Sequence, residues 1–313
     1  MGFTNFPHGV TSFGLPIVGG LPFHPKTRYL FVDKVNGGSG LSGKAPDQAF
    51  NTLALAHAAM ADGYGDVAVV FPGSYAERLV PTKSHCKFIS ATPWMPELTQ
   101  IVGDGTAGPT VDIDTAAQEG FMLYGFELDV PSGVEQPCLR TETDDAAASP
   151  AAGASGVRGY VGNISVRSNL TRRDPRCGVL IAGGTLLKFG DMFISGCEIG
   201  IGLTGSDSNN CSDVDFEGRI VFRDNVQADI ATVNSKTDGA TPADRAVSRI
   251  WFRETHHLDE SGGVTRYLNL GAIAATRCMI SDMVTAQDVA DGTMAIVPAG
   301  WTFMERAGRN IAS

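Results

Sequence analysis

The sequence lacks long hydrophobic runs and has few basic residues. No stretch approaches the roughly 20 apolar residues that cross a bilayer, so no membrane-spanning helix is predicted. The chain has 34 Asp and Glu against 24 Lys and Arg, which gives a formal net charge of -10. Such a surface does not attract nucleic-acid phosphates or anionic lipid headgroups. Nucleic acids and membranes are therefore not expected as partners.

Paired cysteines and cofactor motifs are also missing. The six cysteines have no CxxC pair and no zinc-finger spacing, and they stand at Cys86, Cys138, Cys177, Cys197, Cys211 and Cys278. Several lie in apolar strand-like stretches, where a thiol behaves as a small hydrophobe, so we expect reduced core residues. No phosphate-cradling loop or dinucleotide fingerprint occurs, and no cofactor or metal is expected. The N-terminus has no basic segment before an apolar core, which predicts assembly in a cytoplasm without a signal peptide.

Glycine, proline and short apolar segments are abundant instead. The chain has 38 Gly, 16 Pro and 43% hydrophobic residues, a composition that predicts an ordered protein with many turns and few long helices. Residues 28–33 alternate as a strand does. Asp47 is a good N-cap for a helix at 47–62, since its side chain can accept from free backbone amides. The stretch "DVAVVFPGSY" then predicts a buried strand that ends in a Pro-Gly turn.

This order of elements resembles the opening of right-handed parallel β-helix proteins, often called pectin-lyase-like. The residues that match are Phe31, Val32, Asp33, Gly37, Gly38, Gly40, Asp47, Ala49, Phe50, Pro72, Gly73, Tyr75 and Glu77. The resemblance implies an all-β fold, a right-handed parallel β-helix solenoid with an N-terminal cap helix and an extended N-terminal arm. A cap is needed because an open solenoid end exposes unpaired strand edges and apolar core.

Short strands and turns then follow in cycles of roughly 20 to 30 residues, as the coils of a solenoid require. We predict an arm at residues 1–25, a β-helix at 26–280 and a terminal rung or C-terminal cap at 281–313. Two polar, Pro-containing stretches, 141–156 and 234–246, are predicted to be surface loops that leave the solenoid.

Two charged stretches contain candidate catalytic or metal-binding side chains. In "SDVDFEGRIVF", strand alternation places Val214, Phe216 and Ile220 on one face and sets Asp213, Asp215, Glu217 and Arg219 on the other. The three carboxylates could hold Ca²⁺ or supply a base, as in pectate lyases; the alternative is a solvated strand face. In "ETHHLDE", adjacent histidines must point to opposite faces, so at most one joins Glu254, and a polar turn is the alternative to a metal site.

An active site is not evident in the sequence. Glycoside hydrolases on this fold resemble polygalacturonases, with paired Asp residues and a Gly-His-Gly turn. Here the adjacent Asp pair, Asp144 and Asp145, lies in a predicted loop, and no Gly-His-Gly occurs. A hydrolase needs two carboxyls held at a set separation. The sequence therefore predicts a protein that is not an enzyme.

The first 25 residues carry the predicted function. They contain no charged residue, and they have four Phe, five Gly and four Pro. With the strand that follows, "TNFPHGVTSFGLPIVGG" resembles the start of tailed-phage structural proteins with β-helix bodies. Proline blocks helix and central-strand pairing, so the arm would order on a partner. Its candidate partner-binding residues are Phe3, Phe6, Phe13, Leu15, Ile17 and Phe23.

The resemblance implies a virion protein. We expect a homotrimer that decorates or cements the phage head, with the arm docked on the major capsid protein or another virion protein, since phage β-helix proteins are commonly trimers. The alternative is a tail spike or fibre that binds host-surface glycan, with or without cleavage of polysaccharide. A bacterial polysaccharide lyase is a third class, which the missing signal peptide and catalytic constellation disfavour.

Overall fold

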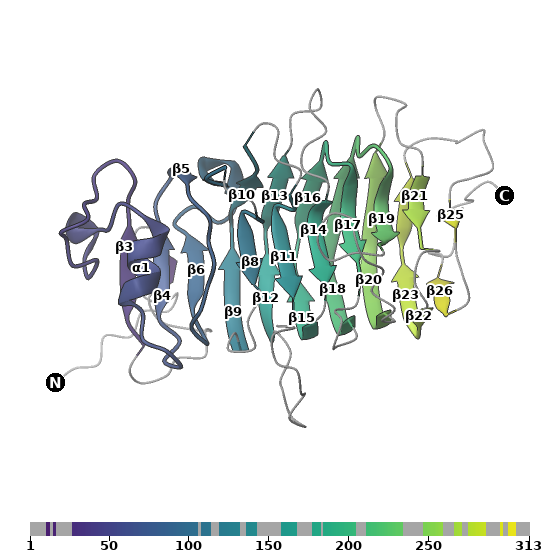
Figure 1. Ribbon diagram of the computed structural model, residues 1–313, viewed down its shortest axis with the longest axis horizontal. Helices are drawn as coiled ribbons and strands as arrows, with labels where there is room; N and C mark the ends of the chain where they lie inside the picture. Colours follow the sequence, from purple (N-terminus) through teal and green to yellow (C-terminus); the bar gives the residue numbers. More distant parts are fainter. Residues whose placement is uncertain are drawn as a thin grey trace.

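The protein is a solenoid of parallel strands. The computed structural model describes residues 11–12, 15–16, 27–105, 108–113, 119–131, 136–142, 158–167, 177–182, 184–204, 211–233, 247–258, 266–270, 275–285, 295–296 and 300–304. In Figure 1 the strands of successive coils lie side by side, from the N-terminal end to the C-terminal end. All pairings in the solenoid are parallel. The fold class is the predicted all-β, right-handed parallel β-helix.

Successive coils contribute strands to up to three faces. The first face contains Tyr29–Val32 (β3), Val67–Val70 (β4), Lys87–Ser90 (β6), Glu119–Tyr124 (β9), Arg158–Gly162 (β12), Gly184–Phe189 (β15), the start of Cys211–Arg223 (β18) and of Val247–Leu258 (β20), Ala275–Thr276 (β22), Cys278–Ser281 (β23) and Trp301–Met304 (β26). The second contains Gly73–Ala76 (β5), Thr99–Val102 (β7), Glu127–Asp129 (β10), Ile164–Arg167 (β13), Met192–Ser195 (β16), the ends of β18 and β20, and Met283–Thr285 (β24). Since β18 and β20 run through the corner, these two faces form one continuous sheet.

The third face is a separate sheet. It consists of Val111–Ile113 (β8), Leu139–Glu142 (β11), Cys177–Ala182 (β14), Ile199–Leu203 (β17), Ala228–Thr232 (β19), Arg266–Asn269 (β21) and Ala295–Ile296 (β25). The stretches 143–156 and 234–246, which include most of the predicted loops, lie outside the described residues.

The core lies between the three faces and is built by stacking like residues from coil to coil. Phe189, Phe216 and Phe252 are fully buried, with ring centroids 4.7 and 4.2 Å apart and nearly parallel planes. Strands β15, β18 and β20 are in parallel register at these positions, so the backbone spacing of about 4.8 Å itself stacks the rings. Aligned aromatic rings thus follow from the parallel ladder.

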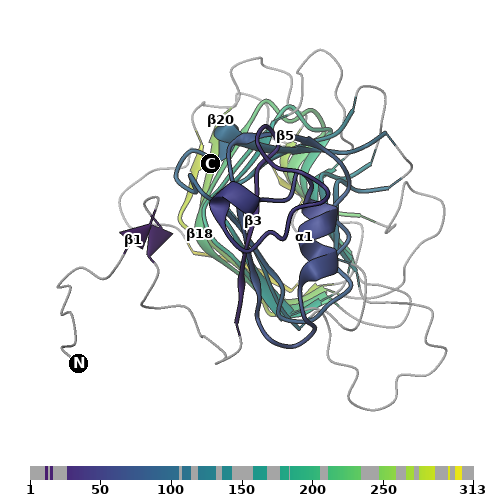
Figure 2. The same cartoon turned by 90° about the vertical axis from the view of Figure 1, so that its left-hand side faces the viewer.

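The N-terminal cap helix is shorter than predicted. Helix α1 spans Leu53–Ala59, and Asp47 lies in a 3-10 turn, η1 (Pro46–Gln48). A second 3-10 turn, η2, spans Pro96–Leu98. The amide of Phe50 donates to Phe31 O (2.9 Å) and its carbonyl accepts from Asp33 N (2.8 Å), so Phe50 is extended and the helix cannot run through it. Figure 2 shows α1 at the N-terminal end of the solenoid.

The first turn of α1 is capped by two side chains. Thr52 Oγ1 accepts from Leu55 N (3.2 Å). The carboxylate of Glu77, which follows β5, accepts from the amides of Leu53 and Ala54 at 2.9 and 3.0 Å. These bonds satisfy amides that a helix start otherwise leaves free. Glu77, one of the residues that carried the family resemblance, thus attaches the cap helix to the solenoid.

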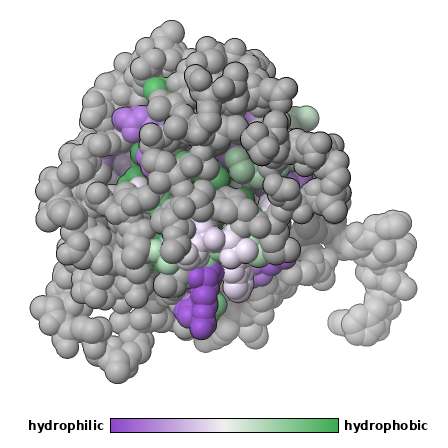
Figure 3. Space-filling view, turned by 90° about the vertical axis from the view of Figure 1, so that its right-hand side faces the viewer, coloured by the Kyte–Doolittle hydropathy of each residue, from purple (hydrophilic) through white to green (hydrophobic). Residues whose placement is uncertain are grey.

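Other sequence predictions concern cysteines and membrane segments. Five cysteines, Cys86, Cys138, Cys177, Cys197 and Cys278, are buried and form no disulfide, as predicted. No helix of the described chain is both long and apolar enough to cross a bilayer. Figure 3 faces the C-terminal end, where both hydrophobic and hydrophilic described residues are visible.

Candidate functional site: a charged groove at one corner

The charged face of β18 forms ion pairs with neighbouring coils. Val214, Phe216 and Ile220 are fully buried, so the predicted alternation is correct. On the outer side, the Arg249 guanidinium donates to Asp213 (both contacts 2.6 Å) and that of Arg253 to Asp215 (3.0 and 2.5 Å).

Glu217 accepts from Lys188 at 2.9 Å. Each carboxylate of the stretch therefore has a basic partner, as on a solvated, ion-paired strand face. Across the described part of the chain, no three His, Cys, Asp or Glu side chains are placed so that they could hold one metal ion.

The two histidines of "ETHHLDE" point in opposite directions, as predicted. His256 Nε2 lies 2.7 Å from Glu254 Oε1 on the outside, where the two side chains are 27% and 43% exposed. His257 is fully buried, stacks on Phe222 with ring centroids 5.1 Å apart, and its Nδ1 lies 2.7 Å from Asp229 Oδ2. Residues 254–258 of the stretch belong to β20 rather than to a turn, and His257 belongs to the core; Asp259 and Glu260 lie outside the described residues.

Residues from successive coils are aligned at the corner between the first and second faces. The register of β13 with β16, of β16 with β18, and of β20 with β18 and β24 places five residues one above the other. We call them the corner column: Asn163, Asp191, Arg219, Glu254 and Asp282. Arg219 and Glu254 lie in β18 and β20, and the other three lie just before the first residue of β13, β16 or β24, so neighbouring members are about 4.8 Å apart along the solenoid axis. The column brings together charges that are far apart in the sequence.

A bulge in β18 shapes the column. Phe216 pairs with Phe252 and Arg219 with Glu254, so β18 has one more residue than β20 at this corner. A bulge leaves backbone groups without ladder partners; here the amide of Arg219 donates to Asp191 Oδ1 at 2.8 Å. A Cβ on Gly218 would lie only 2.2 Å from the carbonyl carbon of Gly190. Only glycine therefore allows the two coils to approach at this point.

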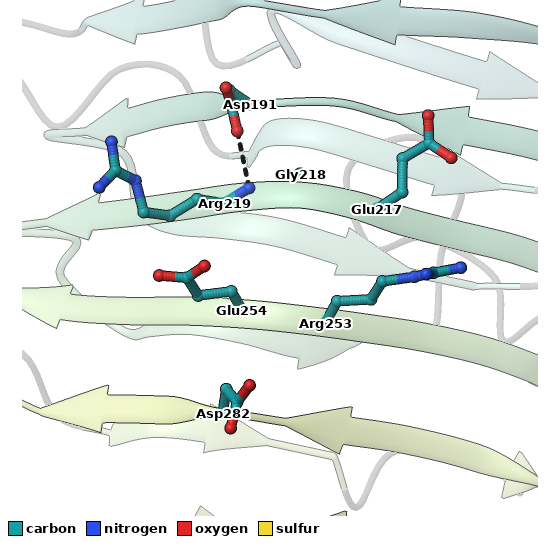
Figure 4. A pocket seen from close by; sticks show the side chains of 7 residues that line it. All are labelled: Asp191, Glu217, Gly218, Arg219, Arg253, Glu254 and Asp282. Atoms are coloured by element: carbon teal, nitrogen blue, oxygen red, sulfur yellow. Dashed lines mark hydrogen bonds between the residues drawn. The ribbon is translucent and has the colours of Figure 1, made fainter. Parts of the chain in front are cut away.

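The corner column opens into a hollow of about 410 Å³, which we call the corner groove. It is lined by four carboxylates and two guanidinium groups around one glycine, namely Asp191, Glu217, Gly218, Arg219, Arg253, Glu254 and Asp282. Figure 4 shows Arg219 and Glu254 extended to one side, with Asp191 and Asp282 on the coils beyond them, and Glu217 and Arg253 on the other side.

The side chains of the corner groove differ in how far they are engaged. Glu217 and Arg253 have the ion-pair partners described above, and the hydrogen bond with Asp215 raises the pKa of Arg253. Among the residues that the structure describes, neither the guanidinium of Arg219 nor the carboxylate of Asp282 has a side-chain partner. These groups are available to a ligand.

The sequence prediction covered this groove only in part. Glu217, Arg219 and Glu254 stood in the two charged stretches, whereas Asp191, Arg253 and Asp282 were not singled out. The missed signal is spacing: Asp191 and Arg219 are 28 residues apart, and Glu254 and Asp282 repeat that interval. Such a repeat indicates residues at equivalent points of adjacent coils.

The structure does not describe the side chains of the predicted partner-binding residues of the arm. Phe3, Phe6, Phe13, Ile17 and Phe23 lie outside the described residues, and Leu15 is described only as backbone. Leu15–Pro16 (β2) pairs antiparallel with Thr11–Ser12 (β1). The proposed docking role of these residues remains a prediction.

Three solved structures resemble the chain. A pectin methylesterase from Aspergillus niger in deglycosylated form is 15% identical over 91% of this chain and 82% of its own, with a TM-score of 0.41. The same enzyme with an N-acetylglucosamine stub is 15% identical over 91% of this chain and 82% of its own, with a TM-score of 0.39. A pectin methylesterase in complex with a hexasaccharide is 14% identical over 88% of this chain and 94% of its own, with a TM-score of 0.36. No family model and no curated protein sequence matches the chain.

The protein therefore belongs to the structural class of parallel β-helices, and it has a charged groove at one corner. The prediction that the chain is not an enzyme is corrected here, because the solved structures that it resembles are those of enzymes. At 15% identity or less and with TM-scores no higher than 0.41, the comparison indicates no particular activity.

Proposed function

We propose that the protein binds a glycan in the corner groove and hydrolyses a glycosidic bond there, with Glu254 and Asp282 as the reacting carboxyl pair. The observation that carries the proposal is their position: both line the groove, on adjacent coils and in register. Glycoside hydrolysis needs two carboxyl groups on opposite sides of the bond that is cleaved. The groove supplies two at one corner of the solenoid, Glu254 in β20 and Asp282 between β23 and β24.

The spacing of the coils suits this reaction. Retaining glycosidases hold their carboxyls about 5–5.5 Å apart, and adjacent strands are about 4.8 Å apart. One carboxyl gives its proton to the leaving oxygen while the other attacks the anomeric carbon and forms a glycosyl ester. Water then adds to that carbon, its proton returns to the first carboxyl, and the sugar is released.

The remaining groups of the groove suit sugar hydroxyls. The guanidinium of Arg219 offers several donors in one plane, and Asp191, fixed by its bond to the Arg219 amide, has a second oxygen that can accept. Convergent polar groups of this kind orient a ligand.

We also propose that the protein works on a phage particle, as the resemblance of its first 25 residues suggests. On this proposal the arm attaches a homotrimer to the capsid or tail, and the corner groove faces host-surface glycan. A place on the tail accords with cleavage of host polysaccharide, and decoration of the head is the second candidate. Imaging of labelled particles distinguishes the two.

The test of the groove uses isosteric variants and purified bacterial surface polysaccharides. Wild-type protein should release saturated reducing ends from at least one of them. Glu254→Gln and Asp282→Asn should lower the rate about a hundredfold or more, the scale of a lost acid or nucleophile. Asp213→Asn is the matched control, since Asp213 lies on the ion-paired face of β18 outside the groove, and it should keep full activity.

Two results would contradict the proposal. Unsaturated ends would indicate elimination instead of hydrolysis. Equal activity of the wild type, Glu254→Gln and Asp282→Asn would show that these two carboxyl groups do not carry out the reaction.

A further inference from the structure

Trp251 presents a large apolar ring next to the corner groove. It stands in β20 between Ile250 and Phe252, which are both fully buried, and it is itself 39% exposed. Alternation along the strand places Trp251 and Arg253 on the same outer side, about 6.6 Å apart along the backbone. Arg253 lines the groove, so Trp251 lies just beyond its edge.

The ion pair of Arg253 fixes this arrangement. Its guanidinium donates to both oxygens of Asp215, at 3.0 and 2.5 Å, and Asp215 is the residue of β18 in register with Trp251. The guanidinium therefore turns back along the sheet, away from the corner and towards the position of Trp251. As a result, a charged planar group lies between the carboxylates of the groove and the indole.

An exposed tryptophan alone needs no explanation, since single apolar residues are common on surfaces. Its position beside a polar groove is informative, because a sugar ring has an apolar C–H face and a rim of hydroxyls. The indole can cover such a face while polar groups bind the rim. On the next coil, the register partner of Trp251 is Met279, which is also apolar and partly exposed, and it extends this surface.

We propose that Trp251 is a sugar-stacking residue and that the groove therefore takes a polysaccharide segment of at least two sugar units, one at the carboxylates and one on the indole. This inference rests on the proposed function. The bound chain lies along β20, from Glu254 past Arg253 to Trp251, a distance of about 10 Å for three residues. The ligand class is thus an oligo- or polysaccharide rather than a monosaccharide.

The test measures affinity against oligosaccharide length. The probes are size-fractionated oligosaccharides from mild acid hydrolysis of the polysaccharide that the wild-type protein cleaves, titrated in a Glu254→Gln background so that they stay intact. Trp251→Ala should bind the longer fragments about tenfold more weakly and should bind monosaccharide unchanged. Trp251→Phe, which keeps an aromatic face, should recover part of the loss.

Tryptophan fluorescence provides a second measurement with a matched control. The chain has three tryptophans; Trp94 is 61% exposed and does not line the groove, and Trp301 is 8% exposed. Binding of a long fragment should change the emission of the Trp94→Phe variant and leave that of Trp251→Phe unchanged.

The outcomes separate the two proposals. If the wild type cleaves polysaccharide and Trp251→Ala binds every fragment as tightly as its parent, the inference about Trp251 is wrong and the proposed function stands. If the wild type neither binds nor cleaves any surface polysaccharide tested, both proposals fail.

Discussion

Asp66 joins the first strand of the solenoid to the end of the cap helix. Its side chain is buried and accepts from the amide of Arg28 (2.9 Å), the Arg28 guanidinium (2.5 and 3.1 Å) and the amide of Ala61 (2.7 Å). Burial alone would raise the pKa of Asp66. The hydrogen bonds and charge of Arg28 and the backbone amides outweigh it, so the pKa of Asp66 is below its usual value. The ionised carboxylate therefore stabilises the fold.

Replacement of Asp66 by Asn removes this charge. We expect Asp66→Asn to lower the free energy of unfolding at neutral pH by about 1.5–3 kcal/mol, the usual range for hydrogen bonds to charged groups. Chemical denaturation monitored by circular dichroism measures the change. Asp47→Asn, at an exposed position of η1, is the control and should unfold as the wild type does.

The difference in the free energy of unfolding between the wild type and Asp66→Asn should depend on pH. Because the pKa of Asp66 is lower in the folded than in the unfolded protein, its contribution is complete above the unfolded value of about 3.9. It is lost as the pH falls from there through the folded value. The stabilities of wild type and Asp66→Asn should converge in acid, and a constant gap down to the lowest accessible pH would contradict this assignment.

At the scale of elements, the bulge in β18 depends on one glycine. A Cβ on Gly218 would meet backbone atoms of Gly190 and Asp191 at 2.2 and 2.3 Å, and backbone cannot move aside as a flexible side chain can. We expect Gly218→Ala to lower the free energy of unfolding by about 3 kcal/mol, at the upper end of the cost of overpacking. It should also reduce glycan cleavage, because the corner residues shift with the bulge.

Gly40 provides the control for this variant. A Cβ there has no atom within 4 Å, so Gly40→Ala should keep the stability and activity of the wild type. Denaturation midpoints and the cleavage assay compare the two variants. If Gly218→Ala were as stable as Gly40→Ala, the close approach of the two coils would not constrain this corner.

Local sequence signals predicted the elements well where neighbours in the chain decide them. The alternation in β18 and the opposite directions of His256 and His257 follow from strand geometry alone. The start of α1 does not, because it is the pairing of Phe50 with β3 that keeps Phe50 out of the helix. The helix signal at Asp47 is local, whereas the pairing that overrides it is a tertiary contact.

At the scale of the molecule, the stacking of coils could be predicted and the corner groove could not. The fold follows from short strands at regular intervals. To predict the groove, one must know which residues of adjacent coils are in register. The number of residues between equivalent positions varies: Arg219 and Glu254 are 35 residues apart, whereas Asp191 and Arg219 are 28 apart. The longer interval contains the stretch 234–246, whose length conceals the repeat in the sequence.

The proposed attachment to a particle is tested on the whole molecule. A variant that begins at Lys26 should keep the circular dichroism and glycan cleavage of the full chain, because the described coils begin beyond that point. It should no longer bind phage particles that lack the protein, as measured by co-sedimentation. The full-length Glu254→Gln variant is the control and should bind them normally. Particle binding by the shortened chain would refute attachment through the arm.

The corner column takes one residue from each of five successive coils, so the order of its side chains along the solenoid is the order of those coils in the sequence. Exchange of a single coil for another with the same corner geometry would replace one charge and leave the charges above and below it in place, because each coil contacts only its neighbours. The specificity of such a groove can therefore change in separate steps, one coil at a time. A pocket assembled from the loops of a globular domain does not have this modularity.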